Sequence, residues 1–436
     1  MRVAIATLGC KVNQYDTAVI EGRFDEQGWQ RVDFDAEADA YVVNSCTVTD
    51  RADSDARRLA RRARRTNPSG RVIMTGCYAQ VSPESVARLD CVDYVVGLGR
   101  LDDLLRAVAG ELGTKTAVSD LRRADGVATL GISSFPGRSR AFVKVQEGCD
   151  LFCTFCIVPV ARGRSRSVPP RLVLDEIEKL AASGFREIVL TGVHLGGYGS
   201  DLEPPRDLAW LLECIAERRP PVRIRVSSVD PPEITSRFLD VVSDQTLFCP
   251  HFHVPLQAGN DAVLTRMRRR YTVAEASAAI TSLRDRLGED VAVGTDLITG
   301  FPEETDAEYE ETKALANDLG LAYLHVFPYS QRSSTSAAKR YRVLPDSTVH
   351  DRAHRLREFD RGLRARFRSR FLGREARVLF EGARDEVTGR WTGYSEHYVP
   401  VACAEPQGRT GGTLRGVVSR VRIDSAGTDV LQGTML

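Results

Sequence analysis

The stretch "GCDLFCTFCIV", from Gly148 to Val158, decides how the rest of the sequence is interpreted. It holds Cys149, Cys153 and Cys156 in the spacing Cys-x3-Cys-x2-Cys. Zinc sites generally use paired cysteines and four protein ligands, so this spacing does not fit one. Three thiolates can instead hold three irons of a 4Fe–4S cluster and leave the fourth iron free to bind a small molecule. The alternative is a lone metal clip whose fourth ligand comes from outside.

The sequence around this motif alternates between strands and helices. Helices separate most of the predicted strands, as expected for parallel strands with crossover connections. Because a closed (β/α) barrel takes eight strands, the six predicted here indicate a partial (β/α)6 barrel in a domain spanning 139–369. The three cysteines follow the first strand, at the carboxyl edge where barrel chemistry occurs. The predicted strands are 141–146, 188–191, 222–227, 252–256, 291–298 and 323–327, and the predicted helices are 169–184, 207–218, 234–243, 273–287 and 306–319.

The segment 1–113 repeats a second pattern, in which an apolar run is followed by a cysteine and then by a helical stretch. The runs at 3–8, 40–43 and 72–74 precede Cys10, Cys46 and Cys77, and the helices are predicted at 15–27, 52–65 and 83–88, with a further strand at 94–98. Parallel strands place their carboxyl ends on one edge of a sheet, so these cysteines could meet in space. The alternative is that they are buried thiols that act as small hydrophobic side chains.

Two further regions complete the chain. Residues 114–138 are polar and rich in Gly and Ser, and we expect a linker there. A helix with many arginines is predicted at 349–371, and the short alternating segments of 370–436 indicate a small antiparallel β-barrel. Barrels of this type often bind oligonucleotides, although a structural cap or a dimerisation module would have the same pattern.

The net charge does not indicate a binding partner, whereas the lack of long apolar segments indicates where in the cell the protein is found. The 436 residues include 60 Lys and Arg against 59 Asp and Glu, so the net charge of +1 favours no partner. Arginines cluster at 57–65, 162–166, 266–270 and 352–370, where they could bind phosphates or form solvated helix faces. Without a signal peptide or an apolar window of membrane length, we expect a cytoplasmic protein with no membrane partner. Thiols stay reduced in that compartment, and the unmatched cysteines are assigned to packing: Cys91, Cys214, Cys249 and Cys403.

The Cys-x3-Cys-x2-Cys motif, with Phe155 before its last cysteine, resembles that of the radical SAM superfamily. This resemblance implies that S-adenosylmethionine binds the open iron of a 4Fe–4S cluster held by Cys149, Cys153 and Cys156. An electron from the reduced cluster would then cleave the sulfonium and release a 5′-deoxyadenosyl radical. Such chemistry belongs to the cofactor, and the protein supplies position and exclusion.

The resemblance extends nearly end to end, to the methylthiotransferase family that includes MiaB, RimO and MtaB. Its amino-terminal pieces are "TLGCKVNQYD" at 7–16, "NSCTVT" at 44–49 and "TGCYAQ" at 75–80. They imply a second 4Fe–4S cluster with an open iron, held by Cys10, Cys46 and Cys77. "GCKVNQYD" looks most like the MtaB subgroup, and the carboxyl-terminal barrel resembles a TRAM domain.

The reaction implied by this resemblance replaces a C–H bond with C–SCH3. An MtaB-type acceptor would be N6-threonylcarbamoyladenosine at tRNA position 37, whereas relatives of the other types act on isopentenyladenosine in tRNA or on a ribosomal-protein aspartate. One S-adenosylmethionine would methylate a sulfur on the auxiliary cluster and a second would yield the radical. Partners would be the tRNA anticodon stem-loop, an electron donor such as flavodoxin or ferredoxin, and iron-sulfur assembly machinery. The competing hypotheses are an amino-terminal cluster that only relays electrons and a non-catalytic iron-sulfur RNA-binding sensor.

Further family-like pieces suggest residues that contact S-adenosylmethionine. Glycine at 192 would let the backbone approach the methionine moiety, two serines could bond to ribose or carboxylate, and a phenylalanine could border the adenine. His253 could equally be a structural histidine. The candidate cofactor-binding residues are Phe155, Gly192, Ser227, Ser228, His253, Gln257 and Asp296.

Overall fold

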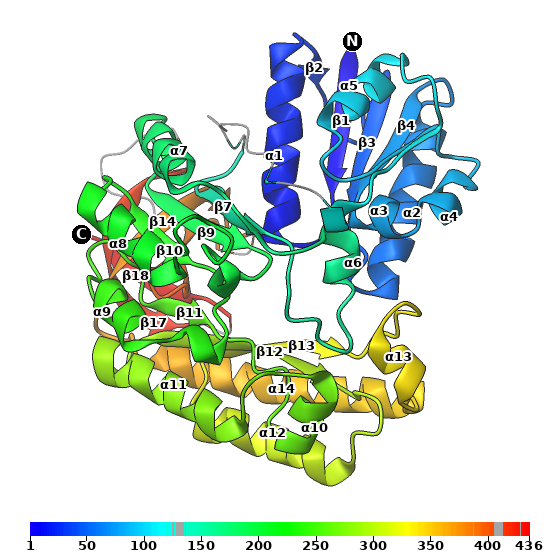
Figure 1. Ribbon diagram of the computed structural model, residues 1–436. Coiled ribbons are helices and arrows are strands. Elements are labelled where there is room, and N and C mark those ends of the chain that lie inside the picture. Colours follow the sequence, from blue (N-terminus) through cyan, green and yellow to red (C-terminus); the bar gives the residue numbers. More distant parts are fainter. Residues whose placement is uncertain (124–125, 128–134, 136, 387, 405–412, 428) are drawn as a thin grey trace.

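The computed structural model describes residues 1–123, 126–127, 135, 137–386, 388–404, 413–427 and 429–436. Along the chain it forms an amino-terminal parallel-sheet domain, a central partial barrel and a small carboxyl-terminal barrel (Figure 1). The predicted α/β fold class is therefore confirmed. In the described part of the chain no helix is both long enough and apolar enough to cross a membrane.

The amino-terminal sheet has six parallel strands in the order β2-β1-β3-β4-β5-β6. Its central strands β3 and β4 are buried on both faces, as their apolar sequences require. The strands are β1 (Arg2–Thr7), β2 (Gln30–Arg31), β3 (Ala40–Ser45), β4 (Arg71–Gly76), β5 (Tyr94–Val96) and β6 (Thr116–Ala117). The helices are α1 (Lys11–Glu26), α2 (Asp50–Thr66), α3 (Cys77–Val81), α4 (Pro83–Ala87) and α5 (Leu101–Ala109).

Strand β6 lies within the segment predicted as a linker from residue 114. It pairs with β5 through Val95–Thr116 and Val96–Ala117, so the first sheet continues into that stretch. A two-residue strand has too little pattern to be found in a polar sequence. A short helix, η1 (Leu121–Arg123), follows, and the predicted linker at 124–125, 128–134 and 136 lies outside the described residues.

The central domain contains the six predicted parallel strands. They form two sheets, β10-β9-β7-β8 and β11-β12-β13, which are joined by isolated bridges from Ile224 to Phe248 and from Ser228 to His253. The extra strand β8 runs antiparallel to β7, so β8 and β13 are the two edges of an open barrel. The strands are β7 (Ala141–Glu147), β8 (Arg166–Ser167), β9 (Glu187–Gly192), β10 (Arg223–Val226), β11 (His251–His253), β12 (Ala292–Thr299) and β13 (Tyr323–Pro328).

Capping residues fix where several of the surrounding helices begin. Thr272 and Glu275 form a reciprocal capping box at the start of α11, and Thr305 and Glu308 form another at the start of α12. The helices are α6 (Val158–Arg162), α7 (Pro170–Ala182), α8 (Leu208–Arg218), α9 (Ser236–Val242), α10 (Asp261–Met267), α11 (Val273–Leu287), α12 (Asp306–Asp318), α13 (Ser336–Arg340) and α14 (Asp346–Ser369), with short 3-10 helices η2 (Leu195–Gly197) and η3 (Pro231–Glu233).

The carboxyl-terminal barrel closes in the order β14-β15-β16-β18-β17. Its strands are β14 (Glu375–Arg384), β15 (Trp391–Tyr394), β16 (Pro400–Cys403), β17 (Val418–Ala426) and β18 (Leu431–Met435). The predicted antiparallel arrangement is wrong at one pair, because β16 and β18 run parallel. A closed ring with an odd number of strands cannot alternate direction all the way round, so one parallel pair is required.

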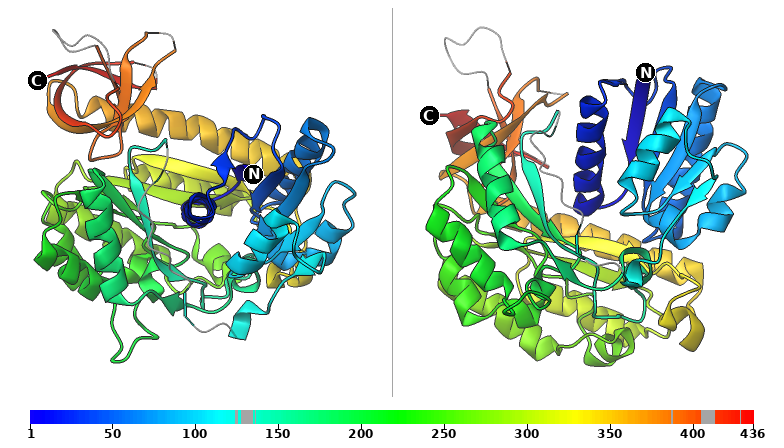
Figure 2. Two further views of the ribbon diagram at one scale, coloured as in Figure 1. Left: turned by 90° about the horizontal axis from the view of Figure 1, so that it is seen from above. Right: turned by 45° about the horizontal axis from the view of Figure 1, so that its top comes forward.

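Buried ion pairs and hydrogen bonds connect the carboxyl-terminal barrel to the central domain. Glu187 on β9 is fully buried and pairs with Arg140, Arg223 and Arg225. Arg223 also donates to the carbonyl of Arg377 at 2.7 Å, on the first strand of the barrel. Figure 2 shows the barrel and the amino-terminal domain attached to different parts of the central domain.

Candidate active site

The loop after β7 carries Cys149, Cys153 and Cys156 at the carboxyl edge of the central sheet. Gly148 begins it with φ = 72°, a conformation that favours glycine. A Cβ at this position would lie 1.9 Å from the carbonyl oxygen of Arg164. The Cys149 amide donates to the Gly163 carbonyl at 3.1 Å, so the loop is held against the segment that follows α6.

Thr154, inside the motif, anchors the other side of the loop. Its amide donates to the carbonyl of Met267 at 3.0 Å and its hydroxyl donates to the carbonyl of Arg266 at 2.8 Å, both at the end of α10. Its own carbonyl accepts from the Ala337 amide at 2.7 Å, in α13. Distant helices therefore fix the loop on which the three thiols lie.

A buried guanidinium lies beside these thiols. Arg269 donates to the Cys153 sulfur at 3.4 Å and to Asp230 at 2.6 Å. Burial and the neighbouring thiols raise the pKa of Cys156 to about 12, and Arg269 opposes this shift. Burial likewise raises the pKa of Cys149 to about 11. Cysteines that coordinate a metal are deprotonated, so three soft ligands beside a cation fit a 4Fe–4S cluster with one open iron.

The sheet edge of the amino-terminal domain brings Cys10, Cys46 and Cys77 together. Cys10 precedes α1, Cys46 follows β3 and Cys77 begins α3. A Cβ on Gly9 would lie 2.7 Å from the Cys46 Cβ, so only a glycine lets these segments approach so closely. Burial raises the pKa of Cys77 to about 12, with contributions from Cys46 and Cys10, while Arg162 opposes it. The donor set again fits a cluster with three thiolate ligands.

A buried ionic network joins the two domains beside these cysteines. Arg162 of α6 donates to Asn13 at 2.5 Å and Asp16 at 3.0 Å on α1, and to Glu147 at 2.7 Å on β7. Lys144 bridges Asp16 at 2.8 Å and Glu147 at 2.9 Å. A cavity of about 270 Å³ lies against the four charged members of this network.

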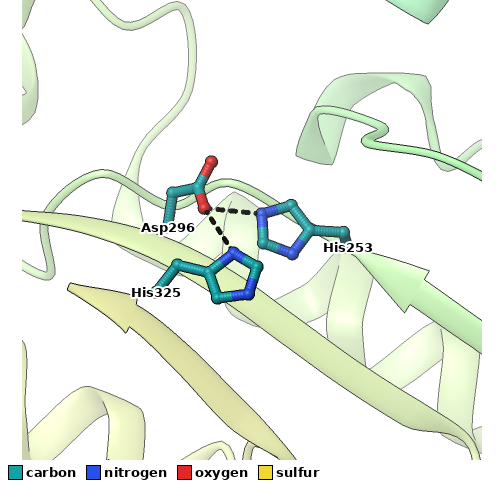
Figure 3. Close-up of side chains that lie close together, drawn as sticks. All are labelled: His253, Asp296 and His325. Atoms are coloured by element: carbon teal, nitrogen blue, oxygen red, sulfur yellow. Dashed lines mark hydrogen bonds and ion pairs between the residues drawn. The ribbon is translucent and has the colours of Figure 1, made fainter. Parts of the chain in front are cut away.

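Two histidines share one carboxylate in the central domain (Figure 3). Asp296 on β12 lies 2.8 Å from the Nε2 of His253 on β11 and 3.2 Å from the Nδ1 of His325 on β13. Burial alone would raise the pKa of Asp296, but its hydrogen bonds to both histidines lower it well below its usual range. The ligand atoms of this trio lie within 4.8 Å of one another.

The other predicted cofactor contacts lie at the carboxyl ends of the strands. Gly192 ends β9, where a Cβ would lie 3.1 Å from Gln146. Phe155 meets Phe301 edge to face, with 6.5 Å between the ring centroids. Gln257 has φ = 68°, and its amide donates to the Asp296 carbonyl at 2.8 Å.

The two candidate serines differ in their surroundings. Ser227 is buried and its hydroxyl accepts from the Lys11 ammonium at 3.2 Å, whereas Ser228 is exposed and bridges to His253 through the backbone. Burial and Arg225 lower the pKa of Lys11 to about 8. The amino-terminal domain thus reaches the predicted S-adenosylmethionine side of the barrel.

Sequence reasoning missed how three basic residues take part in this site. Lys11 stands inside "GCKVNQYD", and Arg162 and Arg269 lie in arginine clusters that were interpreted as phosphate-binding or solvated. The structure corrects that interpretation, because Arg162 is 3% exposed and both arginines form buried ion pairs. The only signal for these residues in the sequence is their position. Lys11 directly follows the predicted ligand Cys10, and Arg162 and Arg269 lie in arginine clusters near the family motifs.

Comparison with known proteins covers nearly the whole chain. The radical SAM superfamily matches residues 143–316, and a family described as uncharacterized protein family UPF0004 matches residues 2–97. A threonylcarbamoyladenosine tRNA methylthiotransferase MtaB of Bacillus subtilis is 36% identical over 99% of this chain and 95% of that protein. The MtaB of Aquifex aeolicus is 37% identical over 87% of this chain and 92% of that protein. A tRNA-2-methylthio-N(6)-dimethylallyladenosine synthase of Staphylococcus aureus is 31% identical over 99% of this chain and 84% of that protein.

A solved structure supports the fold. The radical S-adenosylmethionine methyltransferase TsrM of Kitasatospora setae matches with a TM-score of 0.56 at 16% identity, over 77% of this chain and 75% of that chain. The expected resemblance to MtaB proteins is also confirmed by the relatives above. S-adenosylmethionine and 4Fe–4S clusters are the cofactors of this class of enzyme. The chain belongs to the radical SAM methylthiotransferase family that includes MiaB, RimO and MtaB.

Proposed function

We propose that this enzyme converts N6-threonylcarbamoyladenosine at position 37 of tRNA into its 2-methylthio derivative. The observation that supports this proposal is the contact between the two domains that carry the cysteine trios, through Arg162 with Asn13 and Lys11 with Ser227. The chain also resembles MtaB proteins along nearly its whole length. Relatives named for dimethylallyladenosine make that nucleoside the second candidate acceptor.

In this proposal each cysteine trio holds one cluster. Cys149, Cys153 and Cys156 hold the cluster that binds S-adenosylmethionine, and Cys10, Cys46 and Cys77 hold the auxiliary cluster. A reduced cluster with bound S-adenosylmethionine supplies a radical able to remove hydrogen from adenine C2. S-adenosylmethionine would be positioned by the candidate cofactor-binding residues of the barrel, which are Phe155, Gly192, Ser227, Ser228, His253, Gln257 and Asp296.

The carboxyl-terminal barrel supports an RNA acceptor. Its strands carry Arg384, Arg420 and Arg422, and Arg390 directly precedes β15. Small barrels of this kind often bind oligonucleotides. We assign it as a TRAM-like domain that binds the anticodon stem-loop. The electron donor would be a flavodoxin or ferredoxin, and iron-sulfur assembly machinery would load the clusters in the cytoplasm, where the tRNA is found.

The variant Cys10→Ala tests the division of labour between the clusters. Loss of one auxiliary ligand should abolish methylthiolation, because that site would hold the sulfur, while 5′-deoxyadenosine still forms after anaerobic reduction. Both products are measured by chromatography and mass spectrometry, with Cys91→Ala as a control at a cysteine outside both trios. Methylthiolation at the normal rate in Cys10→Ala would end the auxiliary-cluster assignment.

Mass analysis of tRNA nucleosides from a deletion strain identifies the acceptor. The proposal expects 2-methylthio-N6-threonylcarbamoyladenosine to disappear and its precursor to accumulate. Loss of the 2-methylthio form of isopentenyladenosine instead would favour the second acceptor, and unchanged nucleosides would favour an RNA-binding sensor or a protein substrate.

A further inference from the structure

Lys11 touches both halves of the candidate active site. It is the first residue of α1 and directly follows Cys10, a proposed ligand of the auxiliary cluster. Its side chain leaves the amino-terminal domain, and its ammonium donates to the Ser227 hydroxyl at 3.2 Å, just past the end of β10. The ammonium therefore lies between the two sites, where the reacting base has to bind.

The surroundings of this ammonium leave its charge incompletely paired. Within the described residues its one hydrogen bond goes to a neutral hydroxyl, although an ammonium has three donors. The nearby carboxylate of Asp296 already accepts hydrogen bonds from His253 and His325. A buried cation without an anionic partner is unfavourable, so an arriving anion gains free energy here.

The guanidiniums around Lys11 cannot bind the same anion as readily. Arg225 acts electrostatically on Lys11, as does Arg140, but both pair with the buried Glu187. Arg225 also donates to the carbonyls of Glu396 and Ser395 in the carboxyl-terminal barrel. Among the residues that the structure describes, Lys11 thus keeps hydrogen-bond donors without a partner, whereas Arg225 and Arg140 are engaged.

We infer that Lys11 is a specificity-determining residue, whose ammonium binds the carboxylate of the threonylcarbamoyl group on the acceptor base. This inference rests on the proposed function. Adenine is neutral, and the threonylcarbamoyl substituent ends in a carboxylate that an isopentenyl group lacks. A site built to pair with a charged group rejects an analogue without it, because its own buried charge then stays unpaired.

The test compares anticodon stem-loop RNAs that differ only at this carboxylate. One RNA carries N6-threonylcarbamoyladenosine and the other carries its neutral methyl ester. Methylthiolation by the reconstituted holoenzyme is followed for the wild type, Lys11→Gln and Lys11→Arg. We expect wild-type kcat/KM to favour the acid by tenfold or more, Lys11→Gln to have nearly equal kcat/KM for both RNAs, and Lys11→Arg to recover most of the preference.

Four further measurements separate the possible failures. Iron content and thermal unfolding verify that each variant is folded and loaded. If Lys11→Gln lowers kcat/KM equally for acid and ester, Lys11 does not bind the carboxylate of the acceptor base. Weaker binding of S-adenosylmethionine in that variant would show that the Lys11 ammonium binds the cofactor instead. If the wild-type enzyme methylthiolates neither RNA but accepts one with isopentenyladenosine, the proposed function itself is wrong.

Discussion

Gly148 controls the geometry of the radical-site loop at the scale of one residue. Its positive φ and its closeness to Arg164 leave no room for a side chain before the first cysteine. The loop can therefore bring three thiols toward one point only if this position stays without a Cβ.

Substituting Gly148→Ala should displace the loop and prevent cluster binding at Cys149, Cys153 and Cys156. Because the auxiliary site keeps its cysteines, iron per chain should fall by about half and 5′-deoxyadenosine formation should be lost. Iron and sulfide analysis with chromatography measures both. Gly184→Ala is the matched control, since Gly184 has φ = 95° but open space around its Cβ position. Full iron content in Gly148→Ala would contradict this role.

The sequence revealed the six cysteines but not the charges around them. Ligand spacing is local in Cys149, Cys153 and Cys156, and the strand pattern places Cys10, Cys46 and Cys77 on one edge. The burial of the Arg162 charge depends on Asn13, 149 residues away in the chain, and on Glu147 of the neighbouring strand. No periodicity encodes such a contact, so a buried ion pair was mistaken for a surface cluster.

Helices α1 and α7 meet across the domain interface through a hydrogen bond. Tyr15 on α1 donates to Glu176 on α7 at 3.2 Å, and both side chains are buried. The other carboxyl oxygen of Glu176 has no hydrogen-bond partner among the described residues. Burial raises the pKa of Glu176 to about 8 from its ordinary value of 4.5, although Tyr15 opposes this shift.

This raised pKa predicts how pH affects the free energy of unfolding. Between pH 4.5 and about 8 the folded state binds more protons at Glu176 than the unfolded state does. The stabilising contribution of Glu176 to the free energy of unfolding is therefore complete below pH 4.5 and is lost as pH rises through about 8. Glu176→Gln keeps an acceptor for Tyr15 but cannot ionise. The free energy of unfolding of this variant should therefore rise relative to that of the wild type as pH increases. Near pH 9 the variant should be more stable by about 1–3 kcal/mol.

Chemical denaturation at several pH values measures this difference. Glu178→Gln is the control, because Glu178 lies on the same helix and pairs with Arg218 at the surface. A constant difference between Glu176→Gln and wild type across this pH range would show that the carboxyl is ionised in the folded state.

Long elements could be predicted from the sequence and short ones could not. The sequence predicts α7 because early prolines, apolar residues at spacings of three or four and a closing glycine at Gly184 mark a helix of several turns. Strand β8, only Arg166–Ser167, forms because it pairs with the end of β7. Its conformation depends on a tertiary partner, which its own residues do not reveal.

At the scale of the whole molecule, a second contact holds the amino-terminal domain against the central partial barrel. Arg332, after β13, is 9% exposed and donates to Asp53 at 2.6 Å and to Thr47 at 2.8 Å, and it also pairs with Asp50. Thr47 directly follows Cys46, so this contact fixes the auxiliary-site edge relative to the barrel.

Substituting Arg332→Gln should leave Asp53 buried without its cation, at a cost of about 3 kcal/mol in unfolding free energy. Methylthiolation should fall more than 5′-deoxyadenosine formation, because the side-chain partners of Arg332 lie at the auxiliary-site edge. Thermal unfolding and product analysis measure the two effects, with the exposed Arg340→Gln as control. Equal losses of both products would show that Arg332 only maintains general stability.

The different distribution of the two cysteine trios along the chain has a consequence for biogenesis. Cys149, Cys153 and Cys156 share one loop, whereas Cys10, Cys46 and Cys77 come together only when β1, β3 and β4 have paired. Arg162, which lies against the second trio, is translated after the whole amino-terminal sheet. Cluster delivery to the amino-terminal site therefore has to wait until the whole sheet has formed, whereas the radical-site ligands are already close in sequence and need only the contacts of their loop with α10 and α13.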